Sequence, residues 1–324
     1  MTCLVSAVVL AFGKEELLRE CLRALVVALE RVPGEAELLV VGNALSDEGR
    51  RGLRDTAPDA VLIEPGRNLG FAAGVTVALA QARGEWIALV NDDCVVEPEA
   101  LAELLAAGAQ GSDVGSVAAQ VRFVARPEII NSAGLEIDEP GIAYERLLGA
   151  PVTTSAPDTV EVFGASGATA LYRRAMIDAV GGFDSSFFAY LEDADLAWRA
   201  RMQGWRCLYA PRAVSVHHHS MSLGHSSRAK HFLAGRNRVR MLAKNATTTQ
   251  LLRWGLVMFS YDFAYILFVA ARRSTLAPLR GRLRGLHEWR SYRAAGSAYR
   301  TRVALARPSG LREALRRNRV YNAS

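Results

Sequence analysis

The chain has 324 residues and a mass of 35.2 kDa, with 50% hydrophobic and 22% charged residues. This composition excludes collagen-like, disordered and small disulfide-stapled proteins. The net charge of +6 is unevenly spread, because residues 272–324 hold 14 arginines against two glutamates, which leaves the rest of the chain net negative. The four cysteines are widely spaced without a C-x-x-C pair, which favours a reducing cytosol over a disulfide framework or a zinc knuckle.

Strand-like and helix-like patterns alternate over the first third of the chain. A continuous apolar run at 5–11 predicts a strand covered on both faces, and leucines at helical spacing after it predict a helix. The alternation continues with predicted strands at 37–41, 60–64 and 86–90 and predicted helices at 71–82 and 98–107. We therefore expect a Rossmann-like α/β fold with a mostly parallel central sheet and flanking helices.

The carboxyl ends of the predicted strands are the expected ligand-binding edge of such a sheet. Phe12, Asn43 and the Asn91-Asp92-Asp93 run fall at these ends. No G-x-G-x-x-G motif follows the first strand, so a dinucleotide-binding site is not expected.

The middle of the chain is less regular. Residues 114–159 predict short strands and Gly/Pro turns, to which no chemistry is assigned. The small residues at 164–168 permit close approach of a ligand or a strand to the backbone, and they are equally consistent with tight packing against a helix.

Asn91, Asp92 and Asp93 form the first acidic group. Carboxylate and amide oxygens at a strand end are suitable ligands for Mg²⁺ or Mn²⁺. A turn and helix cap before Pro98 explains the same residues without a metal.

Glu192, Asp193 and Asp195 form the second acidic group, at the start of a predicted helix. The helix dipole favours acids in a first turn, and Asp195 lies four residues before Arg199, a favourable ion-pair spacing. Helix stability accounts for much of this group, but the aromatic residues at 187–190 before it are more typical of a cleft wall.

His217, His218 and His219 follow a predicted strand at 213–216 and make up half of the six histidines. A neutral imidazole is a good ligand for Mn²⁺, so one of them can complete a metal site with Asp93. Surface or core histidines are the alternative interpretation.

An apolar segment at 251–271 precedes the arginine-rich tail and contains Asp262 near its centre. It predicts a helix that lies in one leaflet of a membrane, with a spanning helix and a buried soluble helix as alternatives. The basic tail predicts contact with an anionic surface, either phospholipid headgroups or nucleic acid, or else a solvated helix.

Six segments resemble, in order, the family-2 inverting glycosyltransferases with the GT-A fold, especially the rhamnosyltransferase-like branch. They are VSAVVLAFGKEELLRECLRAL, ELLVVGNALSD, RNLGFAAGVTVAL, GEWIALVNDD, GGFDSSFFAYLEDADLAWRARMQGW and YAPRAVSVHH. The resemblance as a whole spans about residues 4–245. The segment from GGFD to DLAWR is the most diagnostic of them.

The resemblance implies roles for individual residues. It makes Asp193 the general base beside Glu192, and Asp93 and His217 the ligands of Mn²⁺ or Mg²⁺. The implied donor-binding residues are Phe12, Asn43, Arg67, Asn68, Gly70, Asn91 and Asp92.

The resemblance also implies a function. A sugar would pass from a nucleotide diphosphate sugar, with dTDP-rhamnose as the leading candidate, to a polyprenyl-linked or other glycan acceptor. Residues 1–245 would form the GT-A domain, and residues 246–324 an apolar helix and basic tail at an anionic membrane surface, on the cytoplasmic face of the cell membrane. No nucleic-acid partner is expected, because no recognition motif accompanies the arginines, and homo-oligomerisation stays open.

Gly42 departs from the family pattern, because relatives carry an aspartate there that contacts the nucleotide. Asn43 or Asp47 can take its place, or the donor can be unusual. A non-catalytic membrane-associated subunit with a decayed donor site is the remaining alternative.

Overall fold

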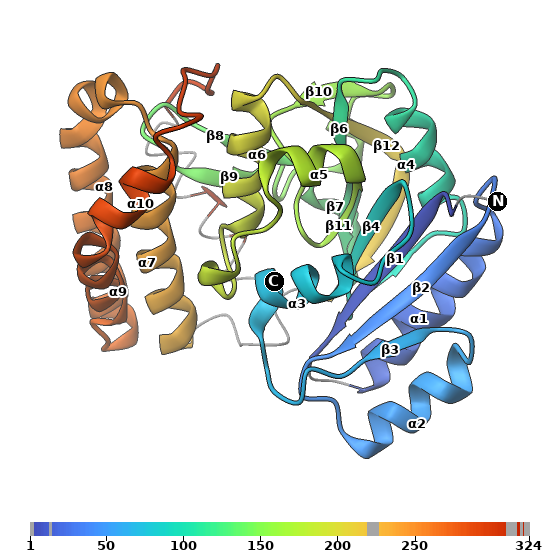
Figure 1. Ribbon diagram of the computed structural model, residues 1–324. Helices are drawn as coiled ribbons and strands as arrows, with labels where there is room; N and C mark the ends of the chain where they lie inside the picture. The colour runs from blue at the N-terminus through green and yellow to red at the C-terminus, as the bar shows by residue number, and fades with distance from the viewer. Residues whose placement is uncertain (1–2, 13–14, 219–226, 309–315, 318–319, 321–324) are drawn as a thin grey trace.

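The structure is a computed structural model that describes residues 3–12, 15–218, 227–308, 316–317 and 320. His219 therefore lies outside the described residues. A twisted central sheet runs through the molecule, with helices on both of its faces and a group of C-terminal helices at one side (Figure 1). The strands are β1 (Val5–Ala11), β2 (Ala36–Gly42), β3 (Val61–Ile63), β4 (Trp86–Asn91), β5 (Cys94–Val96), β6 (Val114–Phe123), β7 (Arg126–Ser132), β8 (Leu135–Ile137), β9 (Ala143–Glu145), β10 (Val160–Val162), β11 (Thr169–Arg173) and β12 (Arg206–His217).

Helices separate most of the strands. They are α1 (Glu15–Glu30), α2 (Asp47–Thr56), α3 (Gly70–Leu79), α4 (Ala100–Gly108), α5 (Arg174–Val180), α6 (Glu192–Met202), α7 (Arg228–Asn245), α8 (Thr248–Arg273), α9 (Ala277–His287) and α10 (Trp289–Ala295), with short 3-10 turns η1 (Val152–Thr154) and η2 (Ser185–Phe187).

The sheet order, within the described residues, is β10-β12-β6-β11-β4-β1-β2-β3, with β5 paired to β12 and β7 to β6. Strands β3, β2, β1 and β4 are parallel to one another, and β6 is parallel to β12. Strand β11 runs antiparallel between β4 and β6 and joins the two parallel parts. The expectation of an α/β fold with a mostly parallel sheet is confirmed.

The predicted elements of the first third are present with small shifts at their ends. The first strand occupies 5–11 as predicted, because all seven of its residues are buried on both faces of the sheet. The helix predicted at 98–107 begins instead at Ala100, so Pro98 lies before it and not in its first turn. The prediction of short strands after residue 114 is wrong for β6, whose ten residues lie inside the sheet between β12 and β11.

Each face of the sheet has its own apolar core. On one face, α1, α2 and α4 cover the strands through buried leucines such as Leu22, Leu53 and Leu104. On the other face, α3, α5 and α6 contribute side chains such as Val75 and Ile177. The strands are therefore held between two helical layers, and only their ends are open to a ligand.

The C-terminal helices form a third packed group on the side of α6. Helices α9 and α10 pack on α7, and α9 comes so close that a Cβ atom on Gly281 would lie 2.1 Å from the Phe232 carbonyl oxygen. Trp198 of α6, Met241 of α7 and Met258 of α8 share a buried cluster. Residues after 245 are thus packed on residues before it, and the division at this position stays a prediction.

Helix α8 keeps much of its apolar surface exposed. It is long and apolar enough to cross a membrane by length and composition, and only 11% of its most apolar window is buried. The rest of the described chain therefore leaves most of α8 uncovered, and its contact with a membrane stays a prediction. Its five most exposed large apolar side chains follow one stripe, which we call the outer face of α8: Leu252, Leu256, Phe259, Phe263 and Leu267.

Candidate functional site

The carboxyl ends of β1, β2 and β4 meet at one edge of the sheet. In the parallel register, Ala11 pairs with Gly42 and Leu10 pairs with Asn91. The residues that follow these strand ends are therefore neighbours, as the alternation of strands and helices predicts. The backbone N–H of Phe12 donates a 2.6 Å hydrogen bond to Oδ2 of Asp92, which links the first strand end to the acidic run.

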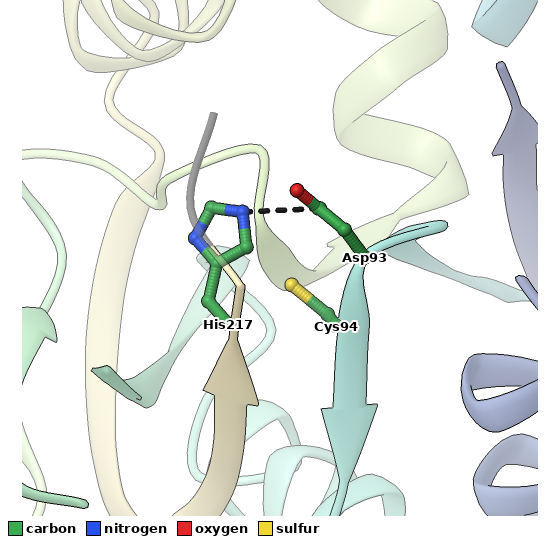
Figure 2. Close-up of side chains that lie close together, drawn as sticks. All are labelled: Asp93, Cys94 and His217. Carbon is green, nitrogen blue, oxygen red and sulfur yellow. Dashed lines mark hydrogen bonds and ion pairs between the residues drawn. The ribbon is translucent and has the colours of Figure 1, made fainter. Parts of the chain in front are cut away.

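Asp93 faces His217 across the pairing of β5 with β12 (Figure 2). Oδ1 of Asp93 lies 3.1 Å from Nε2 of His217, and the other ring nitrogen lies 3.0 Å from Oδ1 of Asn131. Burial alone would raise the pKa of Asp93, but the hydrogen bond and charge of His217 outweigh it and hold the pKa below the usual range. His218 points elsewhere, with its Nε2 3.4 Å from Glu20.

The donor atoms beside Asp93 fit a divalent cation. Asp93, Cys94 and His217 each offer one ligand atom, and these atoms lie within 4.8 Å of one another. Burial raises the pKa of Cys94 well above its usual value, so its thiol stays protonated and is a poor ligand for a hard ion. The carboxylate and the imidazole, oriented by Asn131, are the pair that suits Mn²⁺ or Mg²⁺.

Asp92 is turned toward the first strand end and not toward His217. Burial, and after it the charge of Asp93, raises the pKa of Asp92 to about 7, although the Phe12 amide opposes this shift. In the structure the Asp92 side chain thus fixes the backbone of Phe12, the residue directly after β1.

The loop before α3 is held by two amide side chains. Oδ1 of Asn43 accepts from the Leu69 N–H at 2.6 Å, and Oδ1 of Asn68 accepts from the Gly70 N–H at 2.8 Å. Gly70 has φ +74°, and a Cβ atom there would lie 2.4 Å from the Phe188 carbonyl oxygen, so only glycine fits. Arg67 is exposed beside this loop.

The two proposed substitutes for the missing aspartate at Gly42 are both engaged elsewhere. Asn43 is buried and bonds to the loop through both ends of its amide. Asp47 is an exposed partner of Arg50 at the start of α2. A Cβ atom on Gly42 would instead lie 3.7 Å from Cγ of Glu64, which is the carboxylate side chain nearest to that position.

Glu192 and Asp193 begin α6, as the first-turn pattern predicts. Backbone amides of Gly167 and Ala194 donate to Asp193 at 3.1 and 2.8 Å. Burial raises the pKa of Asp193, and burial together with the charge of Asp193 raises the pKa of Glu192 to about 8. Because the charge of Asp193 disfavours ionisation of Glu192, the pair of carboxyl groups retains a proton at neutral pH.

The segment before this pair is strained. Phe188, Tyr190 and Leu191 all have positive φ values, between 68° and 72°, which is costly for residues other than glycine. The side-chain amide of Asn237 on α7 compensates by donating to the carbonyls of Phe187, Ala189 and Tyr190.

The 164–168 segment connects the two groups of side chains. Its Gly167 amide binds Asp193, and the Ala168 carbonyl accepts a 2.9 Å bond from the Asn91 amide at the end of β4. The packing interpretation is confirmed, because Gly164 packs on Ala197 and Gly167 lies against Asp193, both on α6. Leu135 of β8 also approaches the backbone at Gly164, whereas the approach of a ligand stays a prediction.

Sequence reasoning missed three side chains of this site. Asn131 orients His217, Asn237 holds the strained segment, and Glu145 bonds to Ser166 beside the Asp193 amide donor. Asn131 and Glu145 come from 114–159, where no motif marks them. Only the pairing of distant strands brings them to the site.

Comparison with known proteins decides the family. A family model described as glycosyltransferase-like family 2 matches residues 3–256. The chain belongs to glycosyltransferase family 2. As a member of this family, it is a nucleotide-sugar glycosyltransferase.

Two curated relatives differ in how much of their length this glycosyltransferase covers. The N-acetylglucosaminyl-diphospho-decaprenol L-rhamnosyltransferase of Mycobacterium tuberculosis is 27% identical in an alignment of length 250, which covers 69% of this chain and 79% of that protein. The O-antigen biosynthesis protein RfbC of Myxococcus xanthus is 30% identical over 67% of this chain but only 17% of its own length.

Solved structures confirm the GT-A-like fold of the glycosyltransferase. A mannosyltransferase from Pyrobaculum calidifontis, solved with GDP-Man and Mn²⁺, matches with a TM-score of 0.52 and 18% identity over 92% of this chain and 85% of its own. GalNAc-T7, solved with UDP, GalNAc and Mn²⁺, matches with a TM-score of 0.59 and 13% identity over 76% of this chain and 49% of its own.

Proposed function

We propose that this glycosyltransferase moves a sugar in a single inverting displacement, with Asp193 as the general base and Asp93 and His217 as ligands of Mn²⁺ or Mg²⁺. The observation that supports this proposal most directly is the 164–168 segment. It joins the amide donor of Asp193 to the strand end that precedes Asp93, so the base and the cation site belong to one edge of the sheet.

In this mechanism Asp193 takes the proton from the acceptor hydroxyl as that oxygen attacks the anomeric carbon. The bound cation would neutralise charge on the departing diphosphate. The Gly167 and Ala194 amides orient the Asp193 carboxylate, and Asn131 orients the His217 ring. A direct displacement inverts the anomeric centre and requires no nucleophilic carboxylate.

Glu192 would contribute as a neutral acid. Its Oε2 atom is buried and has no hydrogen-bond partner among the described residues, and a buried polar atom normally has one. With a pKa of about 8, Glu192 holds its proton at neutral pH and can donate it in a hydrogen bond to a substrate hydroxyl.

The proposed nucleotide-binding site is formed by residues at the ends of β1 and β2 and at the start of α3. Phe12, Asn43, Asn68 and Gly70 surround the edge formed by β1, β2 and α3, with Arg67 exposed beside them. We propose dTDP-rhamnose as the donor, on the strength of the rhamnosyltransferase relative. Gly42 is the position where another donor would most readily be accommodated.

The acceptor proposal is a lipid-linked glycan at the cytoplasmic membrane surface. The same relative is named for a decaprenol-linked acceptor, and the outer face of α8 offers unpartnered apolar side chains next to Arg272 and Arg273. Asp262 pairs with Arg238 of α7 and Arg282 of α9, which keeps α8 on the protein and favours a helix lying in one leaflet over a spanning helix.

Calorimetric measurement of nucleotide affinity tests the proposed function. UDP, dTDP and GDP are titrated into detergent-purified protein with and without Mn²⁺. We expect Mn²⁺-dependent binding of dTDP, and loss of the metal dependence in His217→Ala. Binding of UDP or GDP in place of dTDP would replace the rhamnose proposal, and folded protein that binds none of the three would favour the non-catalytic subunit.

A further inference from the structure

Glu145 is a half-buried residue whose carboxyl group lies close to Asp193 and is not used by the proposed mechanism. Glu145 is the last residue of β9. The β8–β9 hairpin contacts the 164–168 segment through a backbone bridge. In this bridge the Leu135 amide donates to the Gly164 carbonyl at 2.7 Å, and the Gly164 amide donates back at 3.3 Å. The hairpin therefore holds one end of the segment that positions the proposed base.

The Glu145 side chain holds the middle of the same segment. Its Oε1 forms a 3.1 Å hydrogen bond with the Ser166 hydroxyl, and its Oε2 forms a hydrogen bond with the Ser132 hydroxyl. Gly167 follows Ser166 directly and donates its amide to Oδ2 of Asp193 at 3.1 Å. Two hydrogen bonds and one peptide unit thus join Glu145 to the proposed base.

The segment has little room to move between its neighbours. A Cβ atom on Gly164 would lie 2.4 Å from Cβ of Ala197 on α6, and one on Gly167 would lie 3.2 Å from Cζ of Phe71. Because these surroundings are close-packed, loss of the Ser166 hydrogen bond changes the position of the neighbouring Gly167 amide.

The charge state of Glu145 suits a supporting role. Burial, and also the charge of Asp193, raises the pKa of Glu145 to about 8, although the Ser132 and Ser166 hydroxyls oppose the shift. The groups that interact with it include Asp193 of α6, these two serines and Tyr172 of β11. At neutral pH the carboxyl is therefore protonated and adds no second negative charge beside Asp193.

We propose that Glu145 is a positioning residue, which fixes the Ser166 hydroxyl and through it aims the Gly167 amide at Asp193. This inference rests on the proposed role of Asp193. It predicts a defect in kcat and not in donor affinity, because the donor-binding residues lie on other elements of the site.

Steady-state kinetics of Glu145→Ala, Ser166→Ala and the double variant test the inference. We expect each single change to lower kcat about 10- to 100-fold, as displaced catalytic groups do, with the donor KM nearly unchanged. The double variant should be no slower than the worse single variant, because both changes break one hydrogen bond. Glu145→Gln keeps the neutral hydrogen-bonding shape and should restore most of kcat.

Glu136→Gln is the matched control, because Glu136 lies on β8 of the same hairpin and pairs with Tyr144. It should leave kcat at the wild-type value. The inference is overturned if folded Glu145→Ala keeps wild-type kcat, or if the effects of the two single changes multiply in the double variant. Failure of the proposed function is seen separately, as equal transfer rates for wild type and Asp193→Asn.

Discussion

Asp193 is the residue on which the proposed chemistry depends. Two backbone amides fix its carboxylate, and burial raises its pKa toward the range in which a carboxylate can accept a proton at neutral pH. We expect Asp193→Asn to lower the transfer rate about 100- to 10,000-fold while nucleotide affinity stays nearly unchanged. Radiolabelled sugar transfer and calorimetry on the same preparation measure the two quantities. A transfer rate equal to that of the wild type would remove Asp193 from this role.

Glu192 should behave differently from its neighbour. Because its pKa is raised to about 8, Glu192 is already protonated at pH 7, and Glu192→Gln imitates that form. We expect this variant to keep most of its activity at pH 7. Above pH 8 the wild type gains a second charge beside Asp193, so its rate should decline more steeply than that of the variant. A pH–rate profile of both proteins measures this, and a variant inactive at pH 7 would contradict it.

At the scale of single residues, motifs in the sequence predict part of the candidate metal site. Asn91-Asp92-Asp93 and the histidine run predict a metal site, and the structure brings Asp93 and His217 together. Which of the neighbouring histidines faces Asp93 depends on strand register, because successive residues of a strand point to opposite faces. The register of β12 against β5, with His217 opposite Cys94, selects His217.

Helix α6 is tied to α7 by a buried charge cluster. Asp195 is fully buried and accepts from Arg199, Lys244 and Asn245 at 2.8 to 3.0 Å. The Asp195 to Arg199 ion pair was predicted from their spacing and is confirmed. The two partners from α7 were not predictable, because nothing in the local sequence relates residues so far apart in the chain.

Breaking this cluster should destabilise the protein. Asp195→Asn leaves Arg199 and Lys244 buried without their shared carboxylate, so we expect the free energy of unfolding to fall by about 3 to 5 kcal/mol. Urea denaturation measures the change. Asp47→Asn is the matched control, because Asp47 pairs with Arg50 at an exposed site and should cost at most about 1 kcal/mol. Similar losses in the two variants would argue against the cluster as a tie between α6 and α7.

At the scale of the whole molecule, the C-terminal helices form one side and β1 to β3 the other (Figure 1). The outer face of α8 is exposed, with Leu252 at 82% and Leu256 at 79% of their maximal surface, which is unusual for soluble surfaces. Since α9 packs on α7, deletion of 246–324 would also expose buried surface of the residues before 246. Substitutions on the outer face of α8 are therefore the cleaner test of membrane contact.

We expect Leu256→Glu combined with Phe259→Glu to reduce binding to anionic phospholipid vesicles at least about 10-fold, because each side chain contributes burial energy of about 1.5 to 3 kcal/mol in the acyl region. Vesicle flotation measures the bound fraction. Val27→Glu with Val61→Glu is the control, since both valines are exposed on elements far from α8 in the sequence. Val27 on α1 exposes 41% of its maximal surface, and Val61 on β3 exposes 42%. Wild-type binding by the α8 variant would show that this face does not contact the membrane.

The sequence by itself determined the α/β class, the strand ends that form the site, the family and the acidic pair at the start of α6. These follow from local periodicity and from short runs of residues, which depend on neighbours within one or two turns. Only the tertiary structure decided that His217 faces Asp93, that Asn131, Asn237 and Glu145 lie at the candidate site, and that the outer face of α8 stays exposed. Each of these features depends on pairing or packing between segments distant in the chain, and local sequence patterns do not predict such contacts.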